Sequence, residues 1–280
     1  MSRIFTLVFV LLLAACSERK ETANANDESK AAVSAGRGVV VLGGETTSAF
    51  ADGLRAAGVT HAKACSSESV AERAKLLASA DVAMILVDAT QGPLPVNRED
   101  VLLSRQFCRG PVMIGFSRSA AVDDPELLEL EELEMRELLN SYELPGDSAT
   151  LCFDSEQAKT KHPKGFPAIA GLLSKLEPVA EASPLQSVRE IEASVYVLAD
   201  AEAFKRSLVR PIEGGTFRVL FGEHEVDAEL RAEKAIQPGS SGPVSIAFPQ
   251  LLNLPPGARF VISREGHAIA AGAIMPSTGK

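Results

Sequence analysis

The pattern of apolar positions changes near residue 185 and divides the chain into two parts. In the first part, short apolar runs alternate with segments whose apolar residues recur at helical spacing. Continuously apolar runs are expected for strands covered on both faces, as in a parallel sheet. The predicted strands are Val39–Leu42, Val82–Val87, Val112–Phe116 and Leu151–Phe153. The predicted helices are Glu68–Ser79, Val96–Phe107, a segment from Pro125 to the stop at Pro145-Gly146, and Pro167–Leu176. This alternation predicts an α/β fold, a parallel sheet with helices on both faces.

The segment that begins at Asp124-Pro125 has the clearest helix start in the chain. Aspartate is a preferred capping residue and proline fits the first helical position. Glu126 then lies near the positive end of the helix dipole. The glutamates that follow predict a solvated acidic face on this helix.

From Val188 onward the apolar positions recur with period two, which is typical of strands with one buried face. The alternating apolar positions are Ala193/Val195/Val197, Val226/Ala228/Leu230 and Val244/Ile246/Phe248. The predicted turns are Gly214-Gly215, Pro238-Gly239, Pro255-Pro256-Gly257 and Gly266. Short strands with turns at this spacing predict an all-β barrel or sandwich.

The N-terminus carries a signal of another kind. Arg3 precedes the uncharged apolar run Ile4–Leu13. This run is short for a membrane-spanning helix, which needs about 20 residues, and it fits a secretory signal peptide. Leu13-Ala14-Ala15-Cys16 resembles the lipobox of bacterial lipoprotein precursors. The resemblance implies cleavage before Cys16 and acyl chains on that cysteine that bind a lipid membrane. The alternatives are an uncleaved anchor and a wrongly placed start codon.

Residues 16–37 are polar, charged and small, which predicts a flexible tether. Ser17 follows the cysteine. By resemblance to sorting in Gram-negative bacteria, this predicts an outer-membrane lipoprotein that faces the periplasm or the cell surface. The formal net charge of −9 disfavours nucleic acid as a partner, because nonspecific nucleic-acid binding depends on neutralising phosphates. A protein partner and an oligomeric state do not follow from the sequence.

The remaining cysteines, Cys65, Cys108 and Cys152, are far apart and have no C-x-x-C spacing. They predict buried free thiols, with one disulfide in an oxidising periplasm as the alternative. The four histidines are isolated, so we predict no metal site.

Four segments, two in each part of the chain, resemble one known family. AMILVDATQGPLPVNREDVLLSRQ (Ala83–Gln106) and VDDPELLELEELEMRELLNSYELPGD (Val122–Asp147) resemble the G domain of bacterial translation elongation factor Tu. REIEASVYVLADAE (Arg189–Glu202) and PPGARFVISREGHAIAAGAI (Pro255–Ile274) resemble its C-terminal β-barrel. The family's middle barrel is absent. The implied division is signal peptide 1–15, tether 16–37, P-loop GTPase-like domain 38–177, linker 178–187 and β-barrel domain 188–280.

The segment Val39–Leu54 has the layout of a phosphate-binding loop, G-x-x-x-x-G-K-[ST]. The lysine position of that motif holds Glu45, whose charge repels phosphates. The residues that still match are weak remnants of a nucleotide site: Gly43, Gly44, Thr46 and Thr47.

The family's other nucleotide motifs are also degenerate. Ala62–Cys65 stands where a magnesium-binding D-x-x-G motif is expected, and Ser117-Arg118-Ser119-Ala120 stands where the guanine-reading N-K-x-D motif is expected. Of the S-A-L/K element, Ser155-Glu156-Gln157 keeps only the serine. A retained scaffold with an erased site is the pattern of a pseudo-GTPase. We therefore expect no catalytic residue and neither GTP nor Mg²⁺ as a cofactor.

These observations predict a membrane-anchored binding or scaffolding lipoprotein, neither a working translation factor nor an enzyme. The alternative is a GTP-binding elongation factor Tu-like protein with residual nucleotide binding or GTPase activity in translation elongation. Its candidate carboxylates are Asp88, Asp123, Asp124 and Asp147. Asp88 follows a strand, where open α/β sheets bind ligands, although a lone carboxylate there more often caps the next loop. A third hypothesis is a cytoplasmic translation factor whose apparent leader is not a signal.

Overall fold

The computed structural model describes residues 38–67, 69–177, 179 and 183–276. The signal peptide, Cys16 and the tether lie outside the described residues, so their prediction stays a prediction. Within the described ranges, no helix combines the length and the apolarity needed to cross a bilayer.

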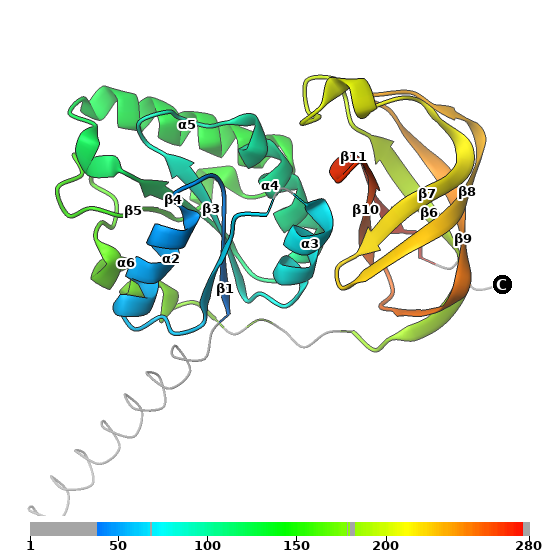
Figure 1. Cartoon of the computed structure of the whole chain (residues 1–280), viewed down its shortest axis with the longest axis horizontal. Coiled ribbons are helices and arrows are strands. Elements are labelled where there is room, and N and C mark those ends of the chain that lie inside the picture. The colour runs from blue at the N-terminus through cyan, green and yellow to red at the C-terminus, as the bar shows by residue number, and fades with distance from the viewer. Residues whose placement is uncertain (1–37, 68, 178, 180–182, 277–280) are drawn as a thin grey trace, which may run out of the picture.

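The first part of the chain folds around a five-stranded parallel sheet (Figure 1). Its strands are β1 (Val39–Leu42), β2 (Ala62–Cys65), β3 (Val82–Asp88), β4 (Val112–Ser117) and β5 (Leu151–Phe153). They lie in the order β2-β1-β3-β4-β5, and every neighbouring pair is parallel. The four strands predicted from apolar runs are confirmed. The edge strand β2 was missed because its four residues include the exposed Lys63 and show no apolar run.

Helices cover both faces of this sheet, as the apolar strands require. The helices are α2 (Thr47–Ala56), α3 (Val70–Ala78), α4 (Pro95–Phe107), α5 (Pro125–Ser141) and α6 (Phe166–Leu173). Successive β3 residues point to opposite faces, so Met84 packs with α2 and α6 while Ile85 packs with α4 and α5. A Phe50–Phe166 edge-on contact, with ring centroids 5.2 Å apart, joins α2 to α6. The predicted α/β class is confirmed.

The start of α5 follows the sequence prediction, but its acidic face does not. The Asp124 carboxylate accepts a hydrogen bond of 3.0 Å from the Glu126 backbone amide, and Pro125 is the first helical residue. However, Glu131 is only 4 % exposed. It lies in the same stripe as the buried Leu128 and Met135, because residues three and four apart share one face of a helix. The prediction of a wholly solvated acidic face is therefore wrong at this glutamate.

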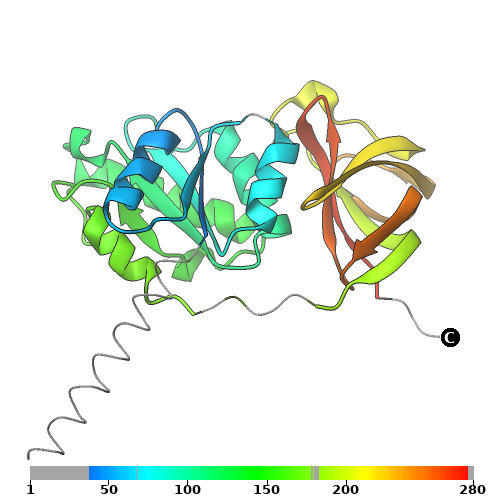
Figure 2. The ribbon, with the colours of Figure 1, turned by 60° about the horizontal axis from the view of Figure 1, so that its bottom comes forward.

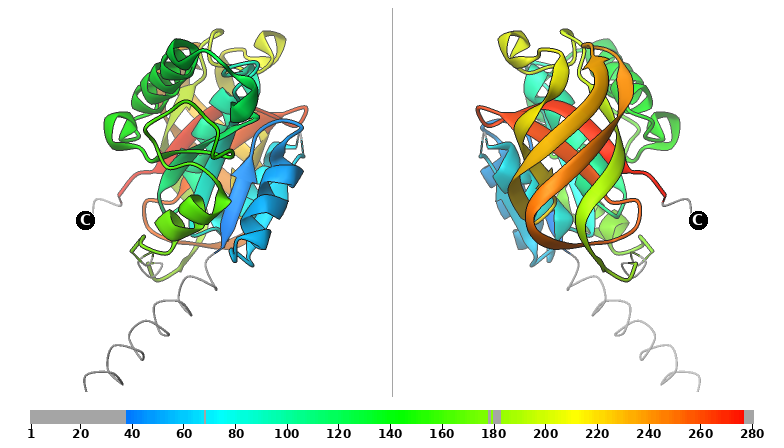
Figure 3. Two further views of the ribbon diagram at one scale, coloured as in Figure 1. Left: turned by 90° about the vertical axis from the view of Figure 1, so that its left-hand side faces the viewer. Right: turned by 90° about the vertical axis from the view of Figure 1, so that its right-hand side faces the viewer.

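The second part forms a closed antiparallel barrel, which decides between the predicted barrel and sandwich (Figure 3, right). Its strands are β6 (Gln186–Val197), β7 (Ile212–Phe221), β8 (His224–Ile236), β9 (Ser241–Leu254), β10 (Arg259–Arg264) and β11 (His267–Ile274). The order is β10-β11-β6-β9-β8-β7, and pairing of β10 with β7 closes the barrel. The apolar positions named from the period-two pattern all point inward and are buried.

One predicted turn is wrong. Gly214 and Gly215 lie inside β7, where the pairing register with β8 shifts after Ile212. Their φ angles of 142° and 118° suit glycine, so the pair forms an irregularity that bends the strand. The chain reverses later, at Gly222, where φ is 61°.

Helices α3 and α4 lie between the sheet and the barrel (Figure 2). The Gln106 side-chain amide of α4 donates to the Phe260 carbonyl at 3.1 Å, and the Arg259 guanidinium of β10 donates to the Arg105 carbonyl at 2.6 Å. The Val70 amide of α3 donates to the Gly266 carbonyl at 3.1 Å. The two parts therefore meet through an interface of buried side chains and direct hydrogen bonds.

Candidate functional site

The carboxyl edge of the parallel sheet is the expected position of a ligand site. The chain leaves β1 toward β2 on one side, and β3 lies on the other side, so the strand order reverses between β1 and β3. Open α/β sheets bind ligands at such a switch point. The predicted remnants Gly43, Gly44, Thr46 and Thr47 follow β1 at this point, and Asp88 ends β3.

Gly43 has a packing role at this edge. Its φ is 137°, and a Cβ atom on it would lie 2.5 Å from the Leu86 carbonyl oxygen. The residue is therefore glycine because β3 approaches the backbone closely, whether or not a ligand binds. The Cβ of a residue at position 44 would meet no atom within 4 Å, and Glu45 is exposed.

The two threonines are bonded within the protein. Thr47 is buried, and its hydroxyl donates to the Gly44 carbonyl at 3.0 Å. The Thr46 hydroxyl lies 2.8 Å from the Ser117 hydroxyl at the end of β4. The Ser117 hydroxyl also lies 3.3 Å from the Val87 carbonyl. These contacts link the ends of β1, β3 and β4.

Charged side chains pair with one another and with loop amides along the rest of this edge. Asp88 forms an ion pair with Arg118, and Asp88 also accepts hydrogen bonds from the amide and the hydroxyl of Thr90, at 3.0 and 2.7 Å. Asp154, after β5, accepts from the Arg118 amide at 2.7 Å and from the Ser119 amide at 3.1 Å. The expectation that Asp88 caps the following loop is confirmed.

The other candidate carboxylates do not gather with Asp88. Asp124 caps α5, Asp123 pairs with Lys159 at 3.3 Å, and Asp147 accepts from the Asn140 amide at 3.0 Å. The carboxylate that does lie beside the Arg118 loop is Asp154, which we did not predict. Its place directly after the apolar run Leu151–Phe153 was the signal that could have identified it.

The thiols are free, as expected from their spacing. Cys65 and Cys152 are buried and Cys108 is half-buried. Burial raises the pKa of all three, that of Cys152 to about 12. The structure holds no disulfide among these three residues. Thiols that stay protonated are poor nucleophiles, so none of them is a candidate reactive cysteine.

A second group of ionisable residues is buried between the two parts of the chain. Arg73 of α3 pairs with both Glu99 and Asp100 of α4, the latter at 2.8 Å. Glu99 also accepts the Ala268 amide of β11 at 2.9 Å and lies 3.7 Å from the His267 ring. Burial raises the pKa of Asp100 to about 6, although the Arg73 guanidinium opposes this effect. This cluster joins the barrel to α4, and no motif in the sequence predicted it.

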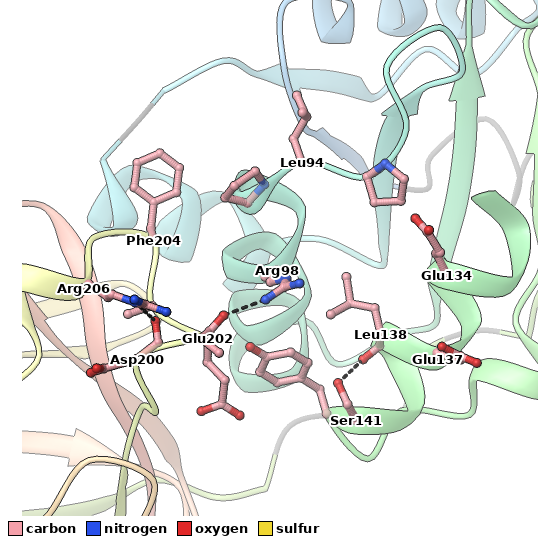
Figure 4. Close-up of a pocket in the computed structure, with 15 residues that line it drawn as sticks. Leu94, Arg98, Glu134, Glu137, Leu138, Ser141, Asp200, Glu202, Phe204 and Arg206 are labelled. Atoms are coloured by element: carbon pink, nitrogen blue, oxygen red, sulfur yellow. Dashed lines mark hydrogen bonds between the residues drawn. The ribbon is translucent and has the colours of Figure 1, made fainter. Parts of the chain in front are cut away.

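A large cavity also lies between the two parts. It measures about 950 Å³ and is bounded by the start of α4, the C-terminal half of α5 and the loop after β6. Figure 4 shows Glu134 and Glu137 on one side and Asp200, Glu202 and Arg206 on the other. A cavity of this size is in the range of ligand-binding pockets. We did not predict it, because its walls are far apart in the sequence.

A comparison with protein-family models finds none that matches this chain.

Proposed function

We propose that this chain is a membrane-anchored lipoprotein and an elongation factor Tu-like pseudo-GTPase that acts as a binding or scaffolding module. In this proposal the α/β part descends from a P-loop GTPase domain and the barrel from the family's C-terminal domain. The anchor is the acylated Cys16, and the protein works outside the cytoplasm, where neither ribosomes nor GTP are available.

The observation that carries the proposal is the state of the carboxyl edge of the sheet. Arg118 and Asp88 pair with each other, and Thr46 contacts Ser117. The Asp154 carboxylate accepts hydrogen bonds from the backbone amides of the loop after β4. These polar groups satisfy one another across the crevice in which a nucleotide would bind. To admit a nucleotide, the edge would have to lose these contacts without gaining the lysine, the magnesium ligand or the guanine acceptor.

The phosphate-binding geometry is unfavourable as well. A bound triphosphate needs free backbone amides at a helix N-terminus and a nearby cation. Here the Thr47 amide donates to the Gly44 carbonyl at 3.3 Å, and the side chain between Gly44 and Thr46 is the exposed carboxylate of Glu45. Only residues 57–61 separate α2 from β2, which leaves no room for a long loop with a second magnesium ligand.

Calorimetry of the full chain in detergent tests the nucleotide part of the proposal. GTP and GDP with Mg²⁺ are titrated into the protein, with a working elongation factor Tu as the positive control. We expect no heat of binding. The Glu45→Lys variant should behave the same way, because the Arg118–Asp88 ion pair and the Thr46–Ser117 contact remain in place. Binding at micromolar affinity would refute the pseudo-GTPase and support the alternative with residual nucleotide binding.

Fractionation tests the anchor. The wild-type chain should sediment with bacterial membranes and incorporate labelled palmitate, whereas Cys16→Ser should lose the label and become soluble. An unlabelled wild-type chain in the cytoplasmic fraction would refute the anchor and would revive the hypothesis of a cytoplasmic factor.

A further inference from the structure

The cavity between the two parts of the chain continues along α4 as a groove. A second cavity of about 460 Å³ shares Ser141, Tyr142 and Glu202 with the larger one. The first cavity begins at Pro95, the first residue of α4, and the second reaches Gln106 in its last turn. We use the name interdomain groove for these two joined cavities.

The dimensions of the interdomain groove suit an extended peptide. Helix α4 has 13 residues, which at 1.5 Å per residue gives a groove about 20 Å long. An extended chain advances about 3.3 Å per residue, so about six residues fill this length. The two cavities together exceed the usual volume of a pocket for one small molecule, which is about 300–1,000 Å³.

Charge is unevenly distributed along the groove. At the end near the start of α4, Glu134 and Glu137 line one side of the cavity and Asp200 lines the other (Figure 4). Among the described residues, none of these three carboxylates forms an ion pair. Arg98 and Arg206 also line this end, and they keep their positive charge while they donate to the carbonyls of Ala201 and Asp200, at 2.6 and 3.4 Å. With Glu202 included, four carboxylates stand against these two guanidiniums, so this end of the groove is acidic.

The opposite end holds two guanidiniums and two carboxylates. Arg105 is paired with Glu143, and Glu202, which lines both cavities, accepts from the Tyr196 hydroxyl and the Ala199 amide. Among the described residues Arg259 forms no ion pair, so its guanidinium is the charge at this end that can meet a carboxylate. Between the two ends, the half-buried Tyr142 contributes an aromatic ring and a hydroxyl. Burial raises the pKa of Tyr142, so its hydroxyl stays protonated and can donate a hydrogen bond. Within the described chain, no other residue forms a hydrogen bond with that hydroxyl.

We propose that the interdomain groove binds an extended peptide segment of a partner protein, with lysine or arginine at the Glu134/Glu137 end and a carboxylate at the Arg105/Arg259 end. The acidic end and the unpaired Arg259 guanidinium fix the orientation of the peptide, and complementary charges at the rim of an interface favour the correct partner. An apolar side chain of the peptide lies against Tyr142. This inference rests on the proposed function, because it names the binding site and the partner class of the binding module.

The test compares two peptide libraries of equal net charge, captured on the full chain in detergent and identified by mass spectrometry. One library has two basic residues, three variable residues and two acidic residues in that order. The other alternates basic and acidic residues around the variable ones. We expect the charge-segregated library to be enriched, because only its peptides match both ends of the groove.

Matched variants locate the binding site. Glu134→Gln with Glu137→Gln removes two exposed ion pairs with the peptide and should weaken capture about tenfold. Glu126→Gln with Glu129→Gln removes the same charge from exposed positions of α5 outside the groove and should have no effect. Ser141→Trp, where the two cavities meet, should block capture, and circular dichroism checks that each variant is folded.

Equal capture of the two libraries, or capture that the Glu134/Glu137 double variant leaves unchanged, would overturn the groove as a peptide site. Calorimetry with GTP on the same preparation separates the two proposals. If neither peptide nor nucleotide binds, only this inference fails. If GTP binds at micromolar affinity, the proposed function fails whatever the peptides do.

Discussion

Glu131 is a carboxyl group in an apolar position, and replacing it with glutamine gives the sharpest prediction. The residue is 4 % exposed, and its Oε2 atom is buried without a hydrogen-bond partner among the described residues. Gly92, in the loop between β3 and α4, lies close to it, because a Cβ added there would be 3.6 Å from the Glu131 Oε1 atom. Burial, with a smaller contribution from the charge of Glu134, raises the pKa of Glu131 to about 7.

The sign and size of the effect follow from this pKa. The folded state binds the proton more tightly than the unfolded state, whose carboxyl titrates near 4.5. The free energy of unfolding therefore falls as the pH rises from about 4.5 to about 7. At 1.36 kcal/mol per pKa unit, the cost of ionising Glu131 in the folded state reaches about 3 kcal/mol above pH 7. Glu131→Gln keeps the shape of the neutral carboxyl and removes this cost.

Urea unfolding at about pH 5 and about pH 8 measures the effect. The chain contains no tryptophan, so far-UV circular dichroism is the appropriate signal. We expect Glu131→Gln to raise the free energy of unfolding by about 2–3 kcal/mol at the higher pH and to change it little at the lower pH. The exposed Glu129→Gln serves as the control and should be neutral at both. A variant that is no more stable than wild type at the higher pH would refute the reasoning, because it would mean that Glu131 is ionised and well paired.

Three further predictions concern packing, the interdomain cluster and the thiols. Gly43→Ala should lower the free energy of unfolding by about 1–3 kcal/mol, since its φ of 137° and the nearby Leu86 carbonyl both exclude a side chain; an unchanged melting temperature would contradict this. Arg73→Ala should lower it by about 3–5 kcal/mol, because two carboxylates of α4 lose a buried counter-charge; small-angle scattering should also detect separation of the barrel, and an unaltered scattering profile with full stability would contradict the role assigned to the cluster. Ellman's reagent should react slowly with Cys65, Cys108 and Cys152 in the folded chain and fully after unfolding; fast reaction in the folded chain would contradict the burial.

The residues next to a glycine in the sequence do not by themselves determine whether that glycine forms a turn. Gly266 separates β10 from β11 as predicted, whereas Gly214-Gly215 bends a continuing strand. Both sites have positive φ angles. The difference is made by the partner strand β8, which continues opposite Gly214-Gly215 and keeps the chain in the barrel. The same holds for Glu131 on a helix. It is buried although the nearby leucines in the sequence, Leu130 and Leu133, are exposed, so its burial could not be predicted from adjacent residues.

The sequence by itself determined most of the elements, though not the edge strand β2, and the class of each part of the chain. Apolar runs and alternating positions report burial directly, because strand and helix periods are local properties of the backbone. The cap at Asp124 and the loop role of Asp88 are local too, since each carboxylate bonds an amide two residues away.

Only the tertiary structure decided which distant side chains meet. It brought Asp154 beside Arg118, buried Glu99 between α4 and the barrel, and joined α4, α5 and the loop after β6 into one groove. These contacts depend on the crossing of helices and on the docking of two separately folded parts. Distances between such residues are set by packing, which no local pattern of residues encodes.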